Sequence, residues 1–374
     1  MKQGWKTKKI KDICCKASSN IAQNKIAELD GDYPVYGASG FVQNVDFYHR
    51  DTEYIGIVKD GSGVGRVNIY PAYSSLLGTL QYILPKDGFI LNYVAYALKS
   101  LNLAKYASGA AIPHIYFKDY GEAVISVPSL EEQQRIVDIL DKEFEKINTL
   151  KANAEKGLQH AKDLYDKILI DKFSYKKGWI KSTLQEECYR ITDGTHQTPQ
   201  YYDSGYIFLS SGNVTNRKIN WDNIKYIDET QHQEMQKRVS PQINDILLAK
   251  NGTTGVAAIV DKNVEFDIYV SLALLRTLGR VTPKYMLYFV NSPLAKEQFN
   301  RRLKGIGVPN LHLTEIRQVE ISFPFEQKEQ NEIVEIIELL DEKFRRFEAI
   351  AQQTIALCDD MKQALLRKAF NGEL

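Results

Sequence analysis

The sequence predicts an α+β fold made of two similar globular domains, each followed by one long helix, with the two helices paired as an antiparallel coiled coil. Three observations lead to this prediction. Segments of the first half return in the same order in the second half. Strand-like runs bounded by glycines dominate each copy, and two stretches carry apolar residues every seven positions. A length of 374 residues is ample for two domains.

The repeat consists of short segments that keep their order while their separation grows. GWKTKKIKDIC from Gly4 returns as GWIKSTLQEEC from Gly178, 174 positions later. IPHI in the first copy returns as VPNL 196 positions later, and EQQRIVDIL from Glu132 returns as EQNEIVEII from Glu329, 197 positions later. The second copy therefore carries about 23 extra residues (197 − 174), most of them before a K-(D/N)-G turn. Two equivalent units imply two equivalent contacts with a partner.

Each copy is expected to place strands and turns before a helix. The predicted strands are 54–58, 66–70, 245–248 and 256–260, where β-branched and aromatic residues gather. The predicted helices are 90–106 and 283–303. Thr282 as N-cap and Pro283 in the first turn favour the start of the second helix.

The two long helices are predicted from heptads whose positions correspond at a separation of 197 residues. The predicted seam consists of Leu140, Ile147, Ala154, Ala161, Ile168, Ile337, Phe344, Ala351, Cys358 and Leu365. Such a pattern is typical of a coiled coil, and Ser129 with Glu132 has the spacing of a capping box. At about 1.5 Å per residue the first helix would be about 66 Å long. Antiparallel packing would place the domains at opposite ends of a rod; the alternative is that each helix folds back on its own domain.

The charge distribution follows the predicted division of the chain. The expected parts are a first domain at 1–128, a central helix at 129–175, a second domain at 176–325 and a C-terminal helix at 326–374. Lys and Arg exceed Asp and Glu by 14 to 11 and 19 to 15 in the domains, and fall below them, 8 to 10 and 7 to 11, in the helices. Basic domains permit contact with a polyanion, although ordinary scatter explains differences of this size equally well.

Several function classes are not indicated. No run of about 18 apolar residues and no secretory signal is present, so no membrane contact is expected. The four cysteines lack metal-ligand spacing, and adjacent Cys14 and Cys15 are a poor disulfide pair, which favours reduced thiols and a cytoplasmic location. Neither a GxxxxGK(S/T) phosphate loop nor an N/D-P-P-Y/F methyltransferase motif occurs. We therefore expect no catalysis, no metal and no cofactor in this chain.

Two loops at matching places are candidates for nucleic-acid contact. DGSGVG from Asp60 follows a strand, but a nucleotide-binding fingerprint requires a helix next, and 66–70 is strand-like. NGTTG from Asn251 occupies the same place, so a tight hairpin is predicted in both copies. Cations and small hydrogen-bond donors would lie on these hairpins, either facing DNA or simply solvated. The candidates are Lys59, Ser62 and Arg66 in the first copy and Lys250, Thr253 and Thr254 in the second.

A further polar loop, ITDGTHQTP, holds Thr195, His196 and Gln197. Glutamine can bind adenine through two hydrogen bonds and threonine can contact the thymine methyl group, so base recognition and a plain surface turn are both open. His196 is a weak metal candidate because no second ligand lies at a suitable spacing. We expect the matching place in the first copy at 37–40. The remaining candidates are Ser39, Gln43 and Asn44 there, and Arg301 and Arg302 for phosphate contact or as a solvated helix end.

The chain resembles the specificity subunits of type I restriction–modification systems over essentially its whole length. The markers are the repeated GW opening, YPVYGASGF from Tyr33, ITDGTHQTP from Ile191, and ISVPSLEEQQRIVDIL with its echo ISFPFEQKEQNEIVEII. The order and duplication of these segments carry the resemblance.

The resemblance implies a non-catalytic subunit that binds double-stranded DNA with a bipartite target. Each domain would recognise one half of the target, and the helices would set the spacing and dock two methyltransferase (modification) subunits. S-adenosylmethionine, ATP and Mg would belong to the methyltransferase and restriction subunits. A rigid helical spacer suits half-sites a fixed distance apart.

The alternative is a pseudo-symmetric protein–protein adaptor without sequence-specific DNA binding. Polar donors and cations, rather than exposed aromatic and aliphatic residues, in the variable loops argue against it.

Overall fold

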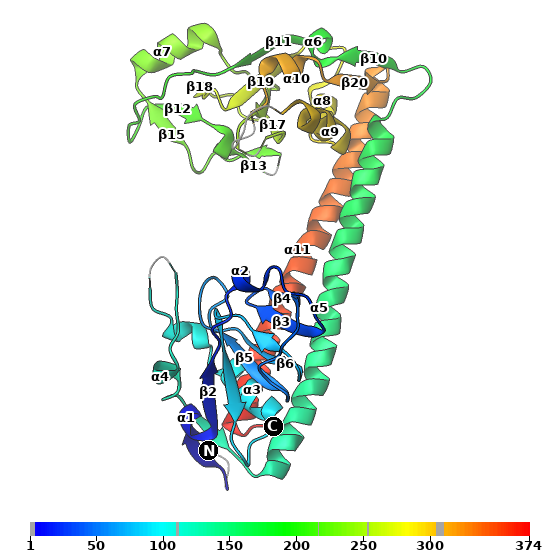
Figure 1. The fold of residues 1–374 in the computed structure, drawn as a ribbon. Coiled ribbons are helices and arrows are strands. Elements are labelled where there is room, and N and C mark those ends of the chain that lie inside the picture. The colour runs from blue at the N-terminus through cyan, green and yellow to red at the C-terminus, as the bar shows by residue number, and fades with distance from the viewer. Residues whose placement is uncertain (1–3, 110–111, 216, 253, 304–309) are drawn as a thin grey trace. The chain divides into compact units, whose positions relative to one another are not determined.

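A computed structural model describes most of the chain, and it divides into two compact units that are treated separately below. The described residues are 4–109, 112–215, 217–252, 254–303 and 310–374. Unit 1 consists of residues 1–155 and 351–374, and unit 2 of residues 156–350. Each unit therefore contains one globular domain with a part of each long helix (Figure 1).

Unit 1 is built around an antiparallel four-stranded sheet with the order β2-β8-β5-β6. Strand β5 (YIGIV) is buried along its whole length, which fits its uninterrupted apolar sequence. A smaller sheet, β4-β3-β7, contains the parallel pair β3 and β7, and β1 pairs with β9. The elements are β1 (Lys6–Lys9), α1 (Ile10–Ile13), β2 (Cys14–Ser18), α2 (Gln23–Ile26), β3 (Tyr33–Gly37), β4 (Gly40–Val45), β5 (Tyr54–Val58), β6 (Val67–Tyr70), β7 (Ser75–Leu76), β8 (Leu80–Pro85), α3 (Leu91–Ser100), η1 (Leu103–Tyr106), α4 (Phe117–Tyr120) and β9 (Val124–Val127).

Unit 2 repeats this topology with sheets β11-β19-β16-β17 and β15-β12-β18 and the pair β10 and β20. The hairpin β13–β14 and helix α7 are additional, and they lie where the two copies drift apart in sequence, as predicted. The elements are β10 (Ile180–Thr183), α6 (Leu184–Glu187), β11 (Cys188–Asp193), β12 (Tyr206–Leu209), η2 (Ser211–Asn213), β13 (Val214–Thr215), β14 (Lys218–Ile219), β15 (Lys225–Ile227), α7 (Glu229–Arg238), β16 (Ile246–Ala249), β17 (Ala257–Ile259), β18 (Phe266–Ile268), β19 (Leu272–Thr277), α8 (Pro283–Val290), α9 (Pro293–Arg302), α10 (Leu313–Arg317) and β20 (Glu320–Phe323).

The prediction of one continuous helix in each domain is wrong. In unit 1 the helix stops before Asn102, which has a left-handed φ of 48°, a conformation that asparagine tolerates better than most residues. In unit 2 the Ser292 hydroxyl accepts a hydrogen bond from the Ala295 amide and Pro293 follows at the first helical position, so a new helix begins there. The predicted N-cap Thr282 is confirmed, because its hydroxyl accepts a hydrogen bond from the Tyr285 amide.

Each long helix is joined to the domain before it by one buried glutamine. The helices are α5 (Leu130–Phe173) and α11 (Gln327–Asn371). The Gln133 amide accepts a hydrogen bond from Ile90 N (3.1 Å) and donates one to Pro128 O (3.2 Å). Gln330, 197 positions later, accepts a hydrogen bond from Thr282 N (2.8 Å) and donates one to Pro324 O (3.0 Å). A buried amide satisfied at both ends fixes where the helix leaves its domain.

The two helices pair in antiparallel fashion inside each unit (Figure 1). In unit 1, Lys151 Nζ donates to Asp359 at 2.8 Å, and Lys362, one turn further along α11, donates to Asn148, which lies earlier on α5. In unit 2 the Tyr165 ring stacks on Phe344 with 5.0 Å between centroids. The predicted α+β fold of two repeated domains with an antiparallel helix pair is confirmed.

The predicted seam positions are all buried or half-buried. Near the helix ends the most buried residue moves one position along, to Leu169 and Leu366, each 2% exposed. At these ends each helix packs against the other copy's domain, because Leu169 belongs to the core of unit 2 and Leu366 to the core of unit 1. Each helix thus contacts its own domain at its start and the other domain at its end. Within the described ranges, no helix combines the length and apolar content that crossing a membrane would require.

Candidate nucleic-acid interface

In unit 1 the β5–β6 hairpin and the IPHI loop are joined by backbone hydrogen bonds. Ile115 N donates to Lys59 O and Gly61 N donates to Pro113 O, both at 3.0 Å. The Asp60 carboxylate and the His114 ring also contact each other across this junction. The two loops therefore form one structure, which we call the double loop.

Unit 2 contains the same junction with different side chains. Leu311 N donates to Lys250 O at 3.0 Å, and Asn251 pairs with Asn310 where unit 1 has Asp60 and His114. The β16–β17 connection is the hairpin that the Asn-Gly sequence predicted. The two units therefore share this backbone arrangement and differ in the side chains that it carries.

In each unit a third loop is connected to the double loop through one short segment, because that segment forms backbone hydrogen bonds with both. In unit 2 the third loop is the one that contains Thr195. In unit 2, Lys250 N donates to Ser271 O and Val270 N donates to Thr195 O, each at 2.9 Å. In unit 1, Lys59 N donates to Thr79 O (3.0 Å) and Gly78 N donates to Ile21 O (2.8 Å). Residue 21 is therefore the structural counterpart of Thr195. The expectation that this counterpart lies at 37–40 is wrong, because that turn connects β3 and β4.

The turn at 37–40 nevertheless lies beside the third loop of unit 1. Both line a hollow of about 810 Å³ together with the connecting segment, and Asn20, Gln23 and Ser39 supply polar side chains to it. Arg66 donates to Ala38 O at 3.1 Å and so links this turn to the double loop. The hollow offers amide and hydroxyl groups next to an exposed cation.

The other candidates of unit 1 differ in accessibility. Ser62 and Asn44 are exposed and Lys59 is half-buried. The Gln43 amide nitrogen donates to the backbone carbonyls of Ile26 and Leu29, so this side chain supports the loop between α2 and β3.

In unit 2 a buried carboxylate organises the base of the double loop. Asp193 accepts hydrogen bonds from Lys250 Nζ (2.7 Å) and from Arg238 (2.6 Å), and His196 Nε2 lies 3.3 Å from the same carboxylate. Burial raises the pKa of Asp193, but the bonds from Lys250 and Arg238 outweigh it, so this pKa lies below its ordinary value. Lys250 is only 6% exposed and its ammonium is held on Asp193.

The exposed side chains of this loop include His196, Gln197 and Thr198. The Thr195 hydroxyl accepts a hydrogen bond from Gln197 N at 3.2 Å, which fixes the turn that presents Gln197. Next to it lies a hollow of about 340 Å³ lined by the loop and by the end of α7. On the hairpin, Thr254 is half-buried, and Thr253 lies outside the described residues.

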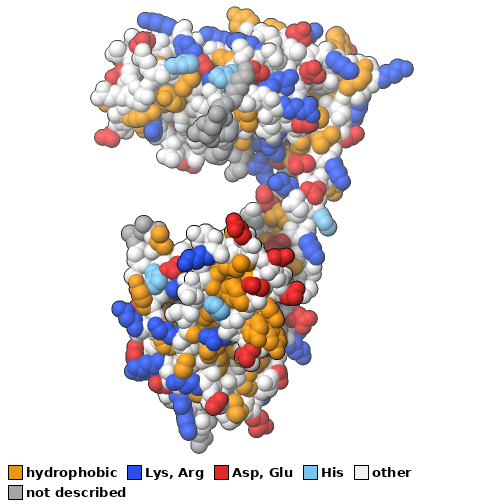
Figure 2. Space-filling view, viewed as in Figure 1, with side chains coloured by type: hydrophobic (Ala, Val, Ile, Leu, Met, Phe, Trp, Pro, Cys, Tyr) orange, Lys and Arg blue, Asp and Glu red, His pale blue; other side chains and the backbone are white. Residues whose placement is uncertain are grey.

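Arg301 and Arg302 lie in the last turn of α9. Arg301 is exposed and contacts Glu297 one turn earlier, whereas Arg302 donates to Gln298 O at 3.1 Å. Figure 2 shows Lys and Arg side chains interspersed with Asp and Glu over the visible face of each unit. The described residues contain no group of three or more His, Cys, Asp or Glu that could hold a metal ion.

Sequence reasoning missed Arg238 and the buried glutamines. Arg238 lies 45 residues from Asp193, and only the folding of α7 onto the sheet brings them together. A signal for Gln133 and Gln330 was available, because they occupy matching places in the EQQ and EQN segments that start both helices.

Comparison with known proteins agrees with this architecture. The family model described as "Type I restriction modification DNA specificity domain" matches residues 2–160 and again residues 177–355. The type I restriction enzyme MjaVIII specificity subunit of Methanocaldococcus jannaschii is 24% identical over 85% of this chain and 82% of the relative. The EcoKI specificity subunit of Escherichia coli K12 is 23% identical over 77% of this chain and 66% of the relative.

Solved structures show the same fold. A chain from a structure concerning complex assembly and conformational transition of the type I R-M system aligns with a TM-score of 0.73 and 16% identity, covering 100% of this chain and 99% of that one. The HsdS subunit from Thermoanaerobacter tengcongensis aligns with a TM-score of 0.50 and 17% identity, covering 100% and 98%. The predicted resemblance is confirmed: with two matched domains spanning most of its length, this chain belongs to the family of type I restriction–modification DNA specificity subunits.

Proposed function

We propose that the chain is a non-catalytic DNA-recognition subunit whose two domains each bind one half of a bipartite target. The observation that carries this proposal is the repeated junction of three loops. The backbone bonds of Lys59 and Ile115 recur at Lys250 and Leu311, while the neighbouring side chains differ. A shared scaffold with different surface groups suits two half-sites of different sequence.

The chemistry of the loops suits contact with a duplex. Arg66 and Lys59 in unit 1 can pair with phosphate, which would make affinity depend on salt. Gln197 in unit 2 can bind adenine through two hydrogen bonds in the major groove. Lys250, held on buried Asp193, is assigned a supporting role: it fixes the hairpin against the strand that leads to Gln197.

The long helices are proposed to dock two methyltransferase subunits, and the assembly to take up restriction subunits. S-adenosylmethionine, ATP and Mg would be bound by those partners, where adenine methylation and ATP-dependent cleavage would take place. The relatives named as specificity subunits of restriction enzymes, and the similarity to a chain of a type I R-M system studied for its assembly, support this division of labour.

The test is to co-express the full chain with a modification subunit of the same system and to map methylated adenines across the host genome. We expect a bipartite motif with a fixed gap. Replacing the loops at 195–199 and 251–255 with glycine-serine turns, which keeps the buried Lys250, should abolish or change one half of that motif and leave the other half intact. A stable complex that methylates no defined motif would favour the adaptor function instead.

A further inference from the structure

A hollow of about 520 Å³ lies in unit 1 where the globular domain meets both long helices. One wall is the double loop around Ser62 and Arg66, and another is the end of α3 with Lys99. The paired helices complete it, α5 with Asn148 and α11 with Lys362. All these residues belong to the same compact unit.

The hollow gathers three cations and no carboxylate. Arg66, Lys99 and Lys362 line it, and its described lining contains no Asp or Glu side chain. Burial and, after it, the charge of Lys362 lower the pKa of Lys99, so the surroundings of this ammonium disfavour its positive charge. Asp141 counteracts this shift, but it accepts the hydrogen bond of the Tyr96 hydroxyl.

The hydrogen bonds of Lys362 and Arg66 go to neutral partners. Lys362 Nζ donates to the Asn148 amide oxygen, and Arg66 donates to the carbonyl of Ala38 at 3.1 Å. An ammonium has three donors and a guanidinium five, so donors remain at each site. Like charges gathered in a partly enclosed space repel one another, and an anion seated among them would reduce that repulsion.

The walls are held in place by backbone packing. Gly65 has a φ of +85°, and a Cβ atom there would lie 2.6 Å from the backbone nitrogen of Ala104, so the double loop lies directly against η1. A position that only glycine fits fixes the distance between Arg66 and the end of α3. The hollow is therefore preorganised.

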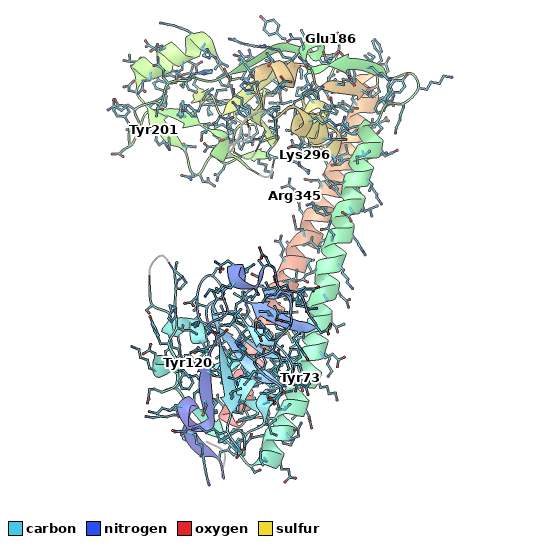
Figure 3. All side chains as sticks on the ribbon, in the orientation of Figure 1. Tyr73, Tyr120, Glu186, Tyr201, Lys296 and Arg345 are labelled. Atoms are coloured by element: carbon cyan, nitrogen blue, oxygen red, sulfur yellow. The ribbon has the colours of Figure 1, made fainter. Side chains whose placement is uncertain are left out.

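Unit 2 has a different charge pattern at the stretch of α11 that corresponds to this part of α5. There a hollow of about 420 Å³ contains cations and carboxylates together. Asp341 binds both Arg217 and Arg345, the latter at 2.7 Å, and Lys284 lies 2.9 Å from Glu338. Figure 3 labels Arg345 on α11. In unit 2 the hollow supplies carboxylate partners to Arg217, Lys284 and Arg345, whereas the described lining of the unit 1 hollow supplies none.

We propose that the unit 1 hollow is a binding site for a phosphate group, supplied by the DNA backbone next to the half-site that unit 1 recognises. This inference rests on the proposed DNA-binding function. The hollow continues from the Ser62–Arg66 part of the double loop, so a duplex on that loop would bring its backbone to the three cations. The contact would carry no sequence information and would fix the register of the duplex on unit 1.

The test uses the full chain with its modification subunit and the double variant Lys99→Gln/Lys362→Gln, since glutamine keeps hydrogen bonding and removes charge. Duplex affinity is measured against salt concentration on a target duplex and on an unrelated duplex. One lost phosphate contact should reduce the slope of log K against log salt by about 0.9. Both duplexes should weaken by the same factor. The matched control is Lys142→Gln/Lys368→Gln, which removes two exposed lysines from the same helices and should leave the slope nearer to wild type.

A second measurement separates the two sources of phosphate. Thermal unfolding is followed with inorganic phosphate against sodium chloride of equal ionic strength, and wild type, but not the double variant, should gain stability in a saturable manner. If phosphate stabilises wild type alone but the double variant keeps the wild-type slope of log K against log salt on DNA, the site binds free phosphate and the DNA contact is overturned. If the double variant folds and assembles but shows neither a reduced salt slope nor a loss of the phosphate-dependent gain in stability, the site itself is overturned. If the wild-type complex binds the target duplex no better than the unrelated duplex, the proposed function itself is refuted.

Discussion

The ammonium of Lys250 lies 2.7 Å from a carboxylate oxygen of Asp193, and both side chains are almost fully buried. The pair connects the end of β11 to the end of β16, the two strands whose following loops carry Gln197 and Thr254. It is therefore a buried ion pair beneath the proposed interface of unit 2.

Removing the carboxylate should destabilise unit 2 strongly. Asp193→Ala leaves the Lys250 ammonium buried without a partner, and breaking a buried pair in this way costs about 3–5 kcal/mol. Lys250→Met should cost less, because Asp193 keeps its bond to Arg238. Hydrogen exchange followed by mass spectrometry measures the loss, with the peptides of unit 1 as an internal control. Equal loss of protection in both variants would contradict this view of the cluster.

The same pair predicts a pH dependence. The pKa of Asp193 is lower in the folded protein than in the unfolded chain. Its contribution to stability is therefore complete above the unfolded value of about 3.9 and is lost as the pH falls through the lower folded value. The difference in unfolding free energy between wild type and Asp193→Asn should shrink as the pH is lowered below about 4. A difference that stays constant from neutral pH to that range would show that the carboxylate is not stabilised by its cations.

How far the sequence predicts this structure depends on the range of the signal. Heptads extend over many turns, so they predicted both long helices closely; α5 begins at Leu130, after the predicted cap Ser129. Short-range turn chemistry also predicted the hairpin after Lys59. The break at Asn102 was not predicted, because a single left-handed residue leaves no periodic trace.

The candidate site was harder to predict because its contacts are long-range. Lys250 meets Asp193 across 57 positions and was expected at the surface as a DNA contact, since nothing nearby in sequence marks its partner. Gln43 looks equally polar in the sequence, yet its amide is bonded to the backbone of an adjacent loop. Only the fold separates a polar side chain that supports a loop from one that the loop presents.

Gln197 is predicted to determine one base pair of one half-site. Gln197→Ala should relax the preference at that position by the about 1–3 kcal/mol that a bidentate contact provides, and should leave the other half-site unchanged. Genome-wide mapping of methylated adenines in the co-expressed complex measures this directly. Gln159→Ala, which alters an exposed glutamine on α5, is the control. An unchanged motif would remove Gln197 from base recognition.

Lys59 is predicted to contact phosphate rather than a base. Lys59→Ala should weaken binding to all duplexes by a similar factor and lower the slope of log K against log salt by about 0.9. Titrations of target and unrelated duplexes at several salt concentrations provide both quantities. A loss confined to the target duplex would mean that Lys59 contacts a base, and an unchanged slope would exclude it from the interface.

The pairing of α5 with α11 predicts how the gap of the target is set. Seven residues complete two helical turns, so inserting one heptad into each helix at matching places keeps the seam in register. The insertion points are after Ala154 in α5 and after Ala351 in α11, positions that are half-buried and buried in the seam. If the helices act as a spacer, the methylated motif should keep both half-sites and acquire a longer gap. Inserting a heptad into α5 alone is the control, because it misaligns the pair and should impair assembly. Methylation mapping decides between the outcomes: altered half-sites with the original gap would show that the helices do not set the spacing.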